Sequence, residues 1–144
     1  MSTTSTGQPR TVTGSRRTEN ERDITSAFEA HAIDNTTFGH AEHVQVAYDL
    51  LRKYDFIDAA AIYAKGIRTL AAKAGAPDKF NLTITYAFMS LIAERLAMTQ
   101  AKTFEAFTKE NPDLMTKTVL DQWYSKDRLN SALARGVFLL PAAA

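Results

Sequence analysis

Apolar residues recur at helical spacing along residues 40–54, and this stretch constrains the fold more than any other part of the chain. With successive residues about 100° apart on a helical wheel, one arc of roughly 120° collects the apolar positions. The arc holds His40, His43, Val44, Ala47, Leu50, Leu51 and Tyr54, and the opposite side holds Glu42, Gln45, Asp49, Arg52 and Lys53. The two histidines therefore continue the apolar stripe. We expect both to point into the body of the protein, one turn apart.

The other patterned segments also repeat the helical period, and no stretch shows the two-residue alternation typical of a strand. Helices are predicted over residues 23–33, 40–54, 56–74, 82–97, 104–110, 114–124 and 126–135, with Thr37 capping the second. The segment 82–97 is apolar nearly all round, which predicts a central, mostly buried helix. The short link between the second and third helices predicts that they pack antiparallel. The predicted fold class is all-α, a compact single-domain bundle of about five to seven helices.

The N-terminal segment differs in composition from the rest of the chain. It is rich in Ser, Thr, Gly and Arg and has almost no large apolar residue. We therefore expect a flexible or extended arm over residues 1–20 and one helical domain over residues 21–144. Residues 1–22 carry four arginines against two glutamates, a charge of +2 in a chain whose total is +1. The arm is interpreted either as a solubilising tail or as a segment that wraps a partner subunit or touches an anion.

Composition excludes several classes of function. There is no cysteine, which rules out a disulfide framework, a thiolate metal site and a cysteine nucleophile. A net charge of +1 gives no reason to expect nucleic acid or an anionic membrane as a partner. No apolar run reaches the roughly 18 residues that a membrane helix needs, and the N-terminus lacks the apolar core of a secretory signal. We expect a cytoplasmic protein, and a homodimer stays open.

The His40 and His43 pair is the feature most suggestive of chemistry. Two histidines three residues apart on one helix face can hold a first-row transition metal, or they can serve as general acid and base. A metal needs at least a third ligand, which could be His31, the only other histidine, or a carboxylate such as Glu94. The alternative is that both imidazoles are structural and bind backbone or hydroxyl groups inside the core.

A second candidate region is the start of the buried helix after residue 81. Free backbone N–H groups at a helix start favour an anionic or carbonyl oxygen, and Thr85 adds a hydroxyl. The simpler interpretation is that Asn81 is an N-cap. Farther along this helix, Thr83, Ser90 and Glu94 form a narrow polar strip that is either exposed to solvent or one wall of a pocket. We take Asn81, Thr85 and Glu94 as candidate substrate-binding residues.

Three strings of residues carry a resemblance to known proteins. They are Phe38-Gly39-His40-Ala41-Glu42-His43-Val44, then Lys79-Phe80-Asn81 with Thr83 and Thr85, then Tyr124-Ser125, Leu129, Ser131, Ala134-Arg135 and Phe138 to Pro141. Together they resemble a group of small bacterial all-helical proteins, most of them uncharacterised, and the likeness covers most of the chain beyond the arm. Members of that group usually carry histidine at the position of Asn81, which would complete a three-imidazole metal site. The resemblance implies a helical fold and a candidate site, and it brings no established activity.

Two hypotheses follow from these observations. In the first, the protein is an acid-base or metal-dependent enzyme that acts on a small molecule in a polar pocket around His40 and His43. In the second, it is a non-catalytic module that binds a ligand or a protein, and its histidines are structural. The first predicts that both imidazoles reach a cavity of a few hundred Å³ together with Asn81 or Glu94.

Overall fold

The computed structural model describes residues 24–142, and the predicted arm over residues 1–20 lies outside this range. After a first helix over residues 24–29, the α-helices are α2 (His40–Lys53), α3 (Phe56–Lys73), α4 (Leu82–Met98), α5 (Phe104–Glu110), α6 (Lys126–Leu129) and α7 (Ala132–Gly136). Four 3₁₀ helices join them: η1 (Asn35–Thr37), η2 (Pro77–Lys79), η3 (Pro112–Met115) and η4 (Val119–Gln122). Residues 24–142 contain no strand, which confirms the all-α fold class.

Side-chain caps set the starts of most helices. Each capping side chain accepts a hydrogen bond from a backbone N–H in the first turn, where the helix itself supplies no acceptor. The caps are Asp55 for α3, Asn81 for α4, Thr103 for α5, Ser125 for α6 and Ser131 for α7. At the other end of α3, Gly75 adopts a φ of 73°, a conformation that glycine reaches at no steric cost.

The cap predicted for α2 is wrong. Thr37 ends the preceding 3₁₀ helix, and the N-cap of α2 is Gly39. The Glu42 side chain reaches back and accepts a hydrogen bond from the Gly39 N–H at 2.8 Å. This contact fixes the first turn of α2, which is the turn that carries both histidines.

Three predicted helices are shorter or broken in the structure. The first ends at residue 29 because His31 turns the chain with a φ of 57°. The segment 114–124 forms η3 and η4 separated by a turn. Its threonines and valine are poor helix formers, and the core contacts of its buried residues hold it in the tighter 3₁₀ conformation. The last predicted helix splits into α6 and α7, because Ser131 starts a new helix.

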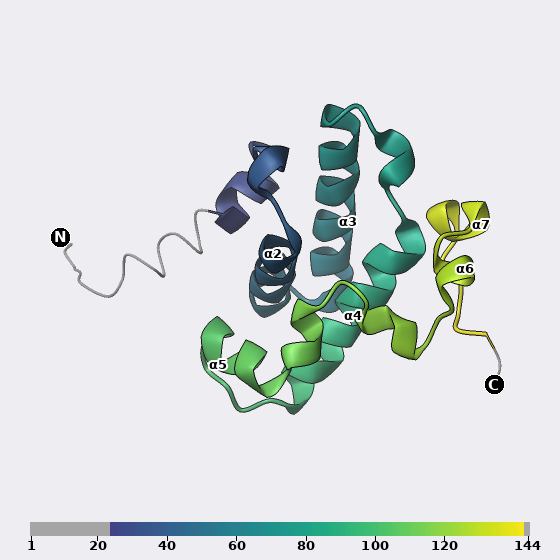
Figure 1. Cartoon of the computed structure of the whole chain (residues 1–144). Coiled ribbons are helices and arrows are strands. Elements are labelled where there is room, and N and C mark those ends of the chain that lie inside the picture. Colours follow the sequence, from purple (N-terminus) through teal and green to yellow (C-terminus); the bar gives the residue numbers. More distant parts are fainter. Residues whose placement is uncertain (1–23, 143–144) are drawn as a thin grey trace.

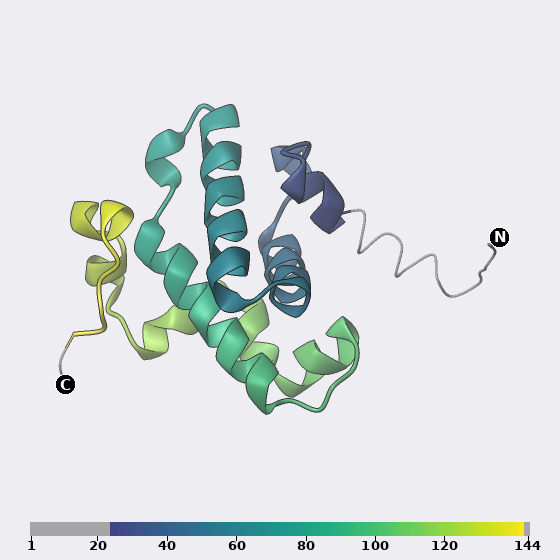
Figure 2. The ribbon, with the colours of Figure 1, turned by 180° about the vertical axis from the view of Figure 1, so that it is seen from behind.

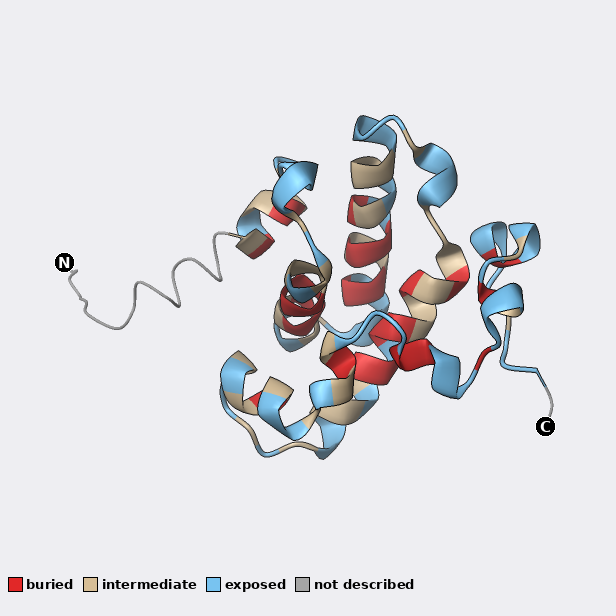
Figure 3. Cartoon of the chain, viewed as in Figure 1, coloured by how far each residue is buried: buried red, intermediate tan, exposed pale blue. Residues whose placement is uncertain are grey.

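Helix α4 crosses the middle of the molecule. From behind, it runs obliquely past the foot of α3, with α6 and α7 beside its start and α5 near its end (Figure 2). Buried positions gather on α2, on the lower half of α3 and along α4 (Figure 3). They form a core cluster that extends from Phe28 to Leu129. The predicted central position of this helix is therefore correct.

Helices α2 and α3 make the most extensive contact between elements, but they do not pack antiparallel. Figure 1 shows α3 from the side and α2 mostly along its axis, so the two helices cross steeply. The steep crossing lets the first turn of α2 face the space between α3 and α4. None of the helices in the described part is both long and apolar enough to cross a bilayer.

Candidate functional site

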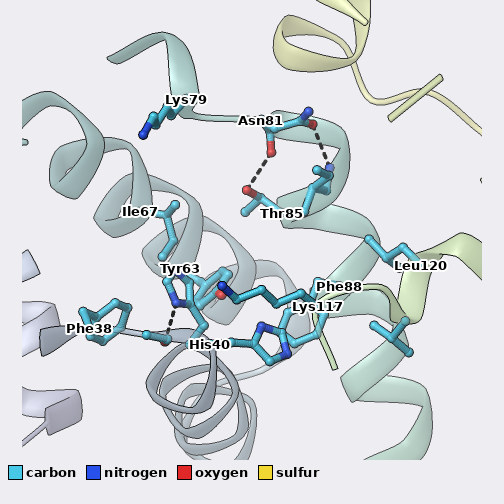
Figure 4. Close-up of a pocket in the computed structure, with 14 residues that line it drawn as sticks. Phe38, His40, Tyr63, Ile67, Lys79, Asn81, Thr85, Phe88, Lys117 and Leu120 are labelled. Atoms are coloured by element: carbon cyan, nitrogen blue, oxygen red, sulfur yellow. Dashed lines mark hydrogen bonds between the residues drawn. The ribbon is translucent and has the colours of Figure 1, made fainter. Parts of the chain in front are cut away.

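A cavity of about 380 Å³ opens between the start of α2, the second half of α3 and the start of α4 (Figure 4). This volume falls in the range of small-molecule sites. The chain from η3 to η4 closes its fourth side. The lining residues are Phe38, Gly39, His40, His43, Tyr63, Ile67, Lys79, Asn81, Ile84, Thr85, Phe88, Lys117, Val119 and Leu120. Both histidines therefore reach a cavity of the predicted size together with Asn81.

His43 is held by its own helix turn and by an aromatic neighbour. Its Nδ1 lies 2.8 Å from the carbonyl oxygen of Gly39, and its ring centroid lies 4.6 Å from that of Phe38. A carbonyl oxygen can only accept, so Nδ1 carries the proton and Nε2 of the neutral ring keeps its lone pair. Burial lowers the pKa of His43, and the neighbouring charges of His40 and Lys117 lower it further. The ring is therefore mostly neutral near pH 7.

His40 is tied to a distant part of the chain. Its Nε2 donates a hydrogen bond to the carbonyl oxygen of Leu114 at 2.9 Å, and its ring packs against Phe88 at 5.7 Å between centroids. By the same argument its Nδ1 keeps the lone pair. Each imidazole thus binds one backbone carbonyl and also lines the cavity, so the structure contains features of both hypotheses.

The loop that accepts the His40 bond is fixed from below by an ion pair. Arg95 of α4 makes two hydrogen bonds to Asp113, at 3.0 and 2.8 Å, and a third to Asn111 at 2.9 Å. The Arg95 guanidinium lowers the pKa of Asp113 to about 2. These three bonds, here called the Arg95–Asp113 clamp, hold η3 against α4. Lys117 at the cavity wall lies two residues beyond the end of η3.

Asn81 is an N-cap whose side chain makes two hydrogen bonds within the fold. Its Oδ1 accepts from the Ile84 N–H at 2.9 Å, and its Nδ2 donates to the Leu129 carbonyl at 2.7 Å. Thr85 is buried, donates its hydroxyl to the Asn81 carbonyl at 2.7 Å and lines the cavity. Both predicted substrate-binding residues at this helix start line the cavity, and each already makes hydrogen bonds within the fold.

Glu94 lies outside the site. It lines a separate cavity of about 220 Å³ between α4 and the C-terminal segment, residues 137–142, together with Ser90 and Trp123. The polar strip predicted on α4 is divided in the structure, because Thr83 is fully buried under the C-terminal segment. Glu94 is more than two turns of helix beyond Thr85, and so it cannot complete a shell around the histidines.

The described residues contain no group of three or more His, Cys, Asp or Glu side chains that could hold a metal ion. His31 is exposed, and its carbonyl accepts a hydrogen bond from Lys73 at the far end of α3, away from the cavity. Within the described chain, the histidine pair therefore has no third His, Cys, Asp or Glu side chain beside it as a metal ligand.

Sequence reasoning missed two polar residues of this cavity, Tyr63 and Lys117. Tyr63 comes from α3 and Lys117 from the turn between η3 and η4. Tyr63 could have been found from its place among small residues on the apolar side of α3. Nothing in the sequence distinguishes Lys117 from other surface lysines, because only the tertiary fold brings that turn to the histidines.

No family model, no curated protein and no solved structure matches this chain. The likeness to helical bacterial proteins stays a prediction.

Proposed function

We propose that the cavity is a small-molecule site in which His43 serves as general base and acid. The observation that carries this proposal is the state of the His43 ring. Its Nδ1 proton is held on the Gly39 carbonyl, and its Nε2 lone pair makes no hydrogen bond within the described residues. A ring whose pKa lies below the ordinary value is a proton acceptor at neutral pH, and such a group at a cavity wall is suited to proton transfer.

The other groups around the cavity support this role. His40 braces the wall through its bond to Leu114, while Phe38, Ile67 and Phe88 supply apolar surface for the body of a ligand. Ligand sites commonly combine such apolar walls with a few polar groups that set orientation. The reaction supported by these groups is proton abstraction or proton relay on a small organic molecule.

The test is a binding screen followed by an assay of turnover. Isotope-labelled protein is screened against a library of small metabolites by NMR, and compounds whose shift changes map to the cavity are tested for conversion. His43→Gln keeps a polar side chain but cannot carry a proton, and a general base contributes about 10²–10⁴-fold to rate. We expect a loss of that order for His43→Gln and no loss for the control His31→Asn, which removes an exposed histidine outside the cavity.

Two outcomes would contradict the proposal. One is conversion of the bound compound by His43→Gln at the wild-type rate. The other is a set of ligands whose shift changes lie away from the cavity. Ligands that bind in the cavity without any conversion would favour the alternative function, a non-catalytic binding module with structural histidines.

A metal-dependent function is a second candidate, favoured by one observation. Each histidine gives one ring nitrogen to a backbone carbonyl, which is the usual outer partner of a metal-bound imidazole. On this alternative, purified protein supplemented with zinc, copper, iron, nickel or manganese retains one equivalent by elemental analysis. His40→Ala and His43→Ala each abolish retention, and Asn81→His tightens it by adding a third imidazole. Less than one equivalent in the wild type would reject this alternative.

A further inference from the structure

Tyr63 presents a buried hydroxyl that nothing in the described chain binds. The side chain is only 2% exposed, and its ring stacks on Phe28 at 5.8 Å between centroids. Its hydroxyl makes no hydrogen bond within the described residues, although Tyr63 lines the cavity. A buried phenol hydroxyl normally has a partner, and a lone one needs an explanation. The open cavity supplies the place for that partner.

Lys117 brings a positive charge to the same cavity. Figure 4 shows its side chain extending across the cavity in the direction of Tyr63. The ammonium makes no ion pair within the described residues, and its charge is felt at His43. Lys79 adds a second ammonium on another wall, and no aspartate or glutamate of residues 24–142 lines the cavity.

The acidic group that acts on His43 is Glu42, the preceding residue of the same helix α2. Glu42 is engaged by the Gly39 N–H at 2.8 Å and is not among the lining residues. The polar groups that face the cavity are therefore donors, cations and neutral acceptors. That combination suits a ligand that brings negative charge.

We propose that the Tyr63 hydroxyl and the Lys117 ammonium bind the anionic group of a small organic acid, a carboxylate or a phosphate ester, and that they place its apolar part beside His43. This inference deepens the function proposed above and rests on it. The hydroxyl donates one hydrogen bond, and the ammonium donates a second, charge-assisted one. The aromatic and aliphatic walls cover the rest of the molecule.

The direct test compares ligands of one shape and different charge. Phenylacetate, its neutral isostere 2-phenylacetamide and the cation 2-phenylethylammonium are titrated by calorimetry, with phenyl phosphate as a second anion. We expect an anion to bind at least about tenfold more tightly than the amide, because a hydrogen bond to a charged group is worth more than a neutral one. The cation should bind most weakly.

Two variants assign the effect to the two residues. Lys117→Gln should remove most of the advantage of the anion over the amide, whereas Lys109→Gln, on α5 outside the cavity, should leave it unchanged. Tyr63→Phe should lower the affinity for both the anion and the amide several-fold. It should leave the melting temperature of the ligand-free protein unchanged or higher, since the hydroxyl has no partner in the described chain.

A third readout follows the protonation of His43. The groups that act on it are His40, Glu42, Lys117 and the Gly39 carbonyl. A bound anion adds an opposite charge, so NMR titration should show the pKa of His43 rising when phenylacetate is present.

Several results would overturn the anion site. These are equal affinity for phenylacetate and phenylacetamide, an equal loss of affinity for the two ligands in Lys117→Gln, or no binding of either anion at about 10 mM. A melting temperature several degrees lower in Tyr63→Phe would also overturn it, because it would reveal a structural partner for the hydroxyl. Neutral or cationic compounds found in the cavity by the metabolite screen would leave the role of His43 intact while rejecting this inference.

Discussion

His40 and His43 make the same kind of hydrogen bond, but removing them has different consequences. The Gly39 carbonyl that accepts from the His43 ring also accepts from the His43 backbone N–H at 3.1 Å, so it keeps a partner when the ring is lost. The Leu114 carbonyl accepts from His40 across 74 positions of the chain, and that bond joins α2 to η3. One bond is local and replaceable, and the other is part of the tertiary structure.

This difference predicts opposite effects of leucine at the two positions. His43→Leu should leave the free energy of unfolding unchanged or raise it by about 0.5–2 kcal/mol, the range of typical stabilising changes. His40→Leu should lower it by about 1–3 kcal/mol, because it strands a buried carbonyl. Denaturant titrations at a pH near 8, where imidazole is mostly neutral, measure both. A clear loss of stability in His43→Leu would show that this histidine is held for structure.

The lowered pKa of His43 also predicts a pH dependence of stability. In the unfolded chain a histidine titrates near its ordinary value of about 6.5, and in the folded protein burial holds the pKa lower. Between these two values the unfolded state binds more protons, so the free energy of unfolding falls as the pH falls. The difference in stability between His43→Leu and wild type should therefore grow in favour of the variant between pH 7 and pH 5. A difference that stays constant over this range would contradict the prediction.

At the scale of elements, one glycine controls how closely the first helix approaches α3. A Cβ added at Gly66 would lie 2.3 Å from Cζ of Phe28, inside the aromatic ring's contact distance. Phe28 in turn stacks on Phe38 and Tyr63, at 5.8 Å between centroids in each pair. This contact therefore positions two residues of the cavity wall, and the absence of a side chain at Gly66 makes it possible.

Gly66→Ala should destabilise the protein although alanine is the better helix former. Alanine gains about 1 kcal/mol of helix propensity over glycine, but the clash with the ring forces overpacking that costs about 1–3 kcal/mol or more. The control is Gly136→Ala in α7, where no atom of the described residues lies within 4 Å of the added Cβ. Thermal unfolding should show a lower midpoint for Gly66→Ala than for wild type, and no lower midpoint for Gly136→Ala. An increase at Gly66 would mean that the ring moves aside freely.

In the molecule as a whole, side chains of α4 and of Tyr124 hold the C-terminal segment by hydrogen bonds to the backbone of that segment. The buried Thr83 hydroxyl donates to the Val137 carbonyl at 2.6 Å and accepts from the Leu139 N–H at 3.0 Å. Tyr124 donates its hydroxyl to the Leu139 carbonyl at 2.8 Å. Several large side chains of this segment remain exposed, so apolar burial contributes little to holding it.

Thr83→Val should loosen this segment more than it lowers global stability. The variant removes both hydroxyl bonds at nearly constant volume, and about 1.4 kcal/mol corresponds to a tenfold change in an opening equilibrium. We expect hydrogen exchange of the Leu139 amide to become at least about tenfold faster. Thr69→Val is the control, since the Thr69 hydroxyl donates to the Lys65 carbonyl of its own helix α3. Unchanged exchange at Leu139 would show that packing alone holds the segment.

The long helices and the inward position of the histidine pair could be predicted from helical periodicity and capping residues. Caps such as Asp55 and Thr103 bond to a backbone N–H within four residues, and the apolar stripe of α2 follows the helical repeat. Both are local features, so both can be recognised from the sequence. The short segments after residue 111 were decided by tertiary contacts. A turn of helix there gains little from propensity, and the Arg95–Asp113 clamp favours the 3₁₀ path.

The composition of the site was likewise decided by the tertiary structure. Tyr63 and Lys117 line the same cavity as His43 only because α2 crosses α3 steeply and the turn after η3 lies at the cavity wall. Glu94 shares a helix face with Thr83 in sequence, yet the C-terminal segment covers one and leaves the other beside a different cavity. Helical periodicity predicts which way a residue points, but the packing of neighbouring elements determines what it faces.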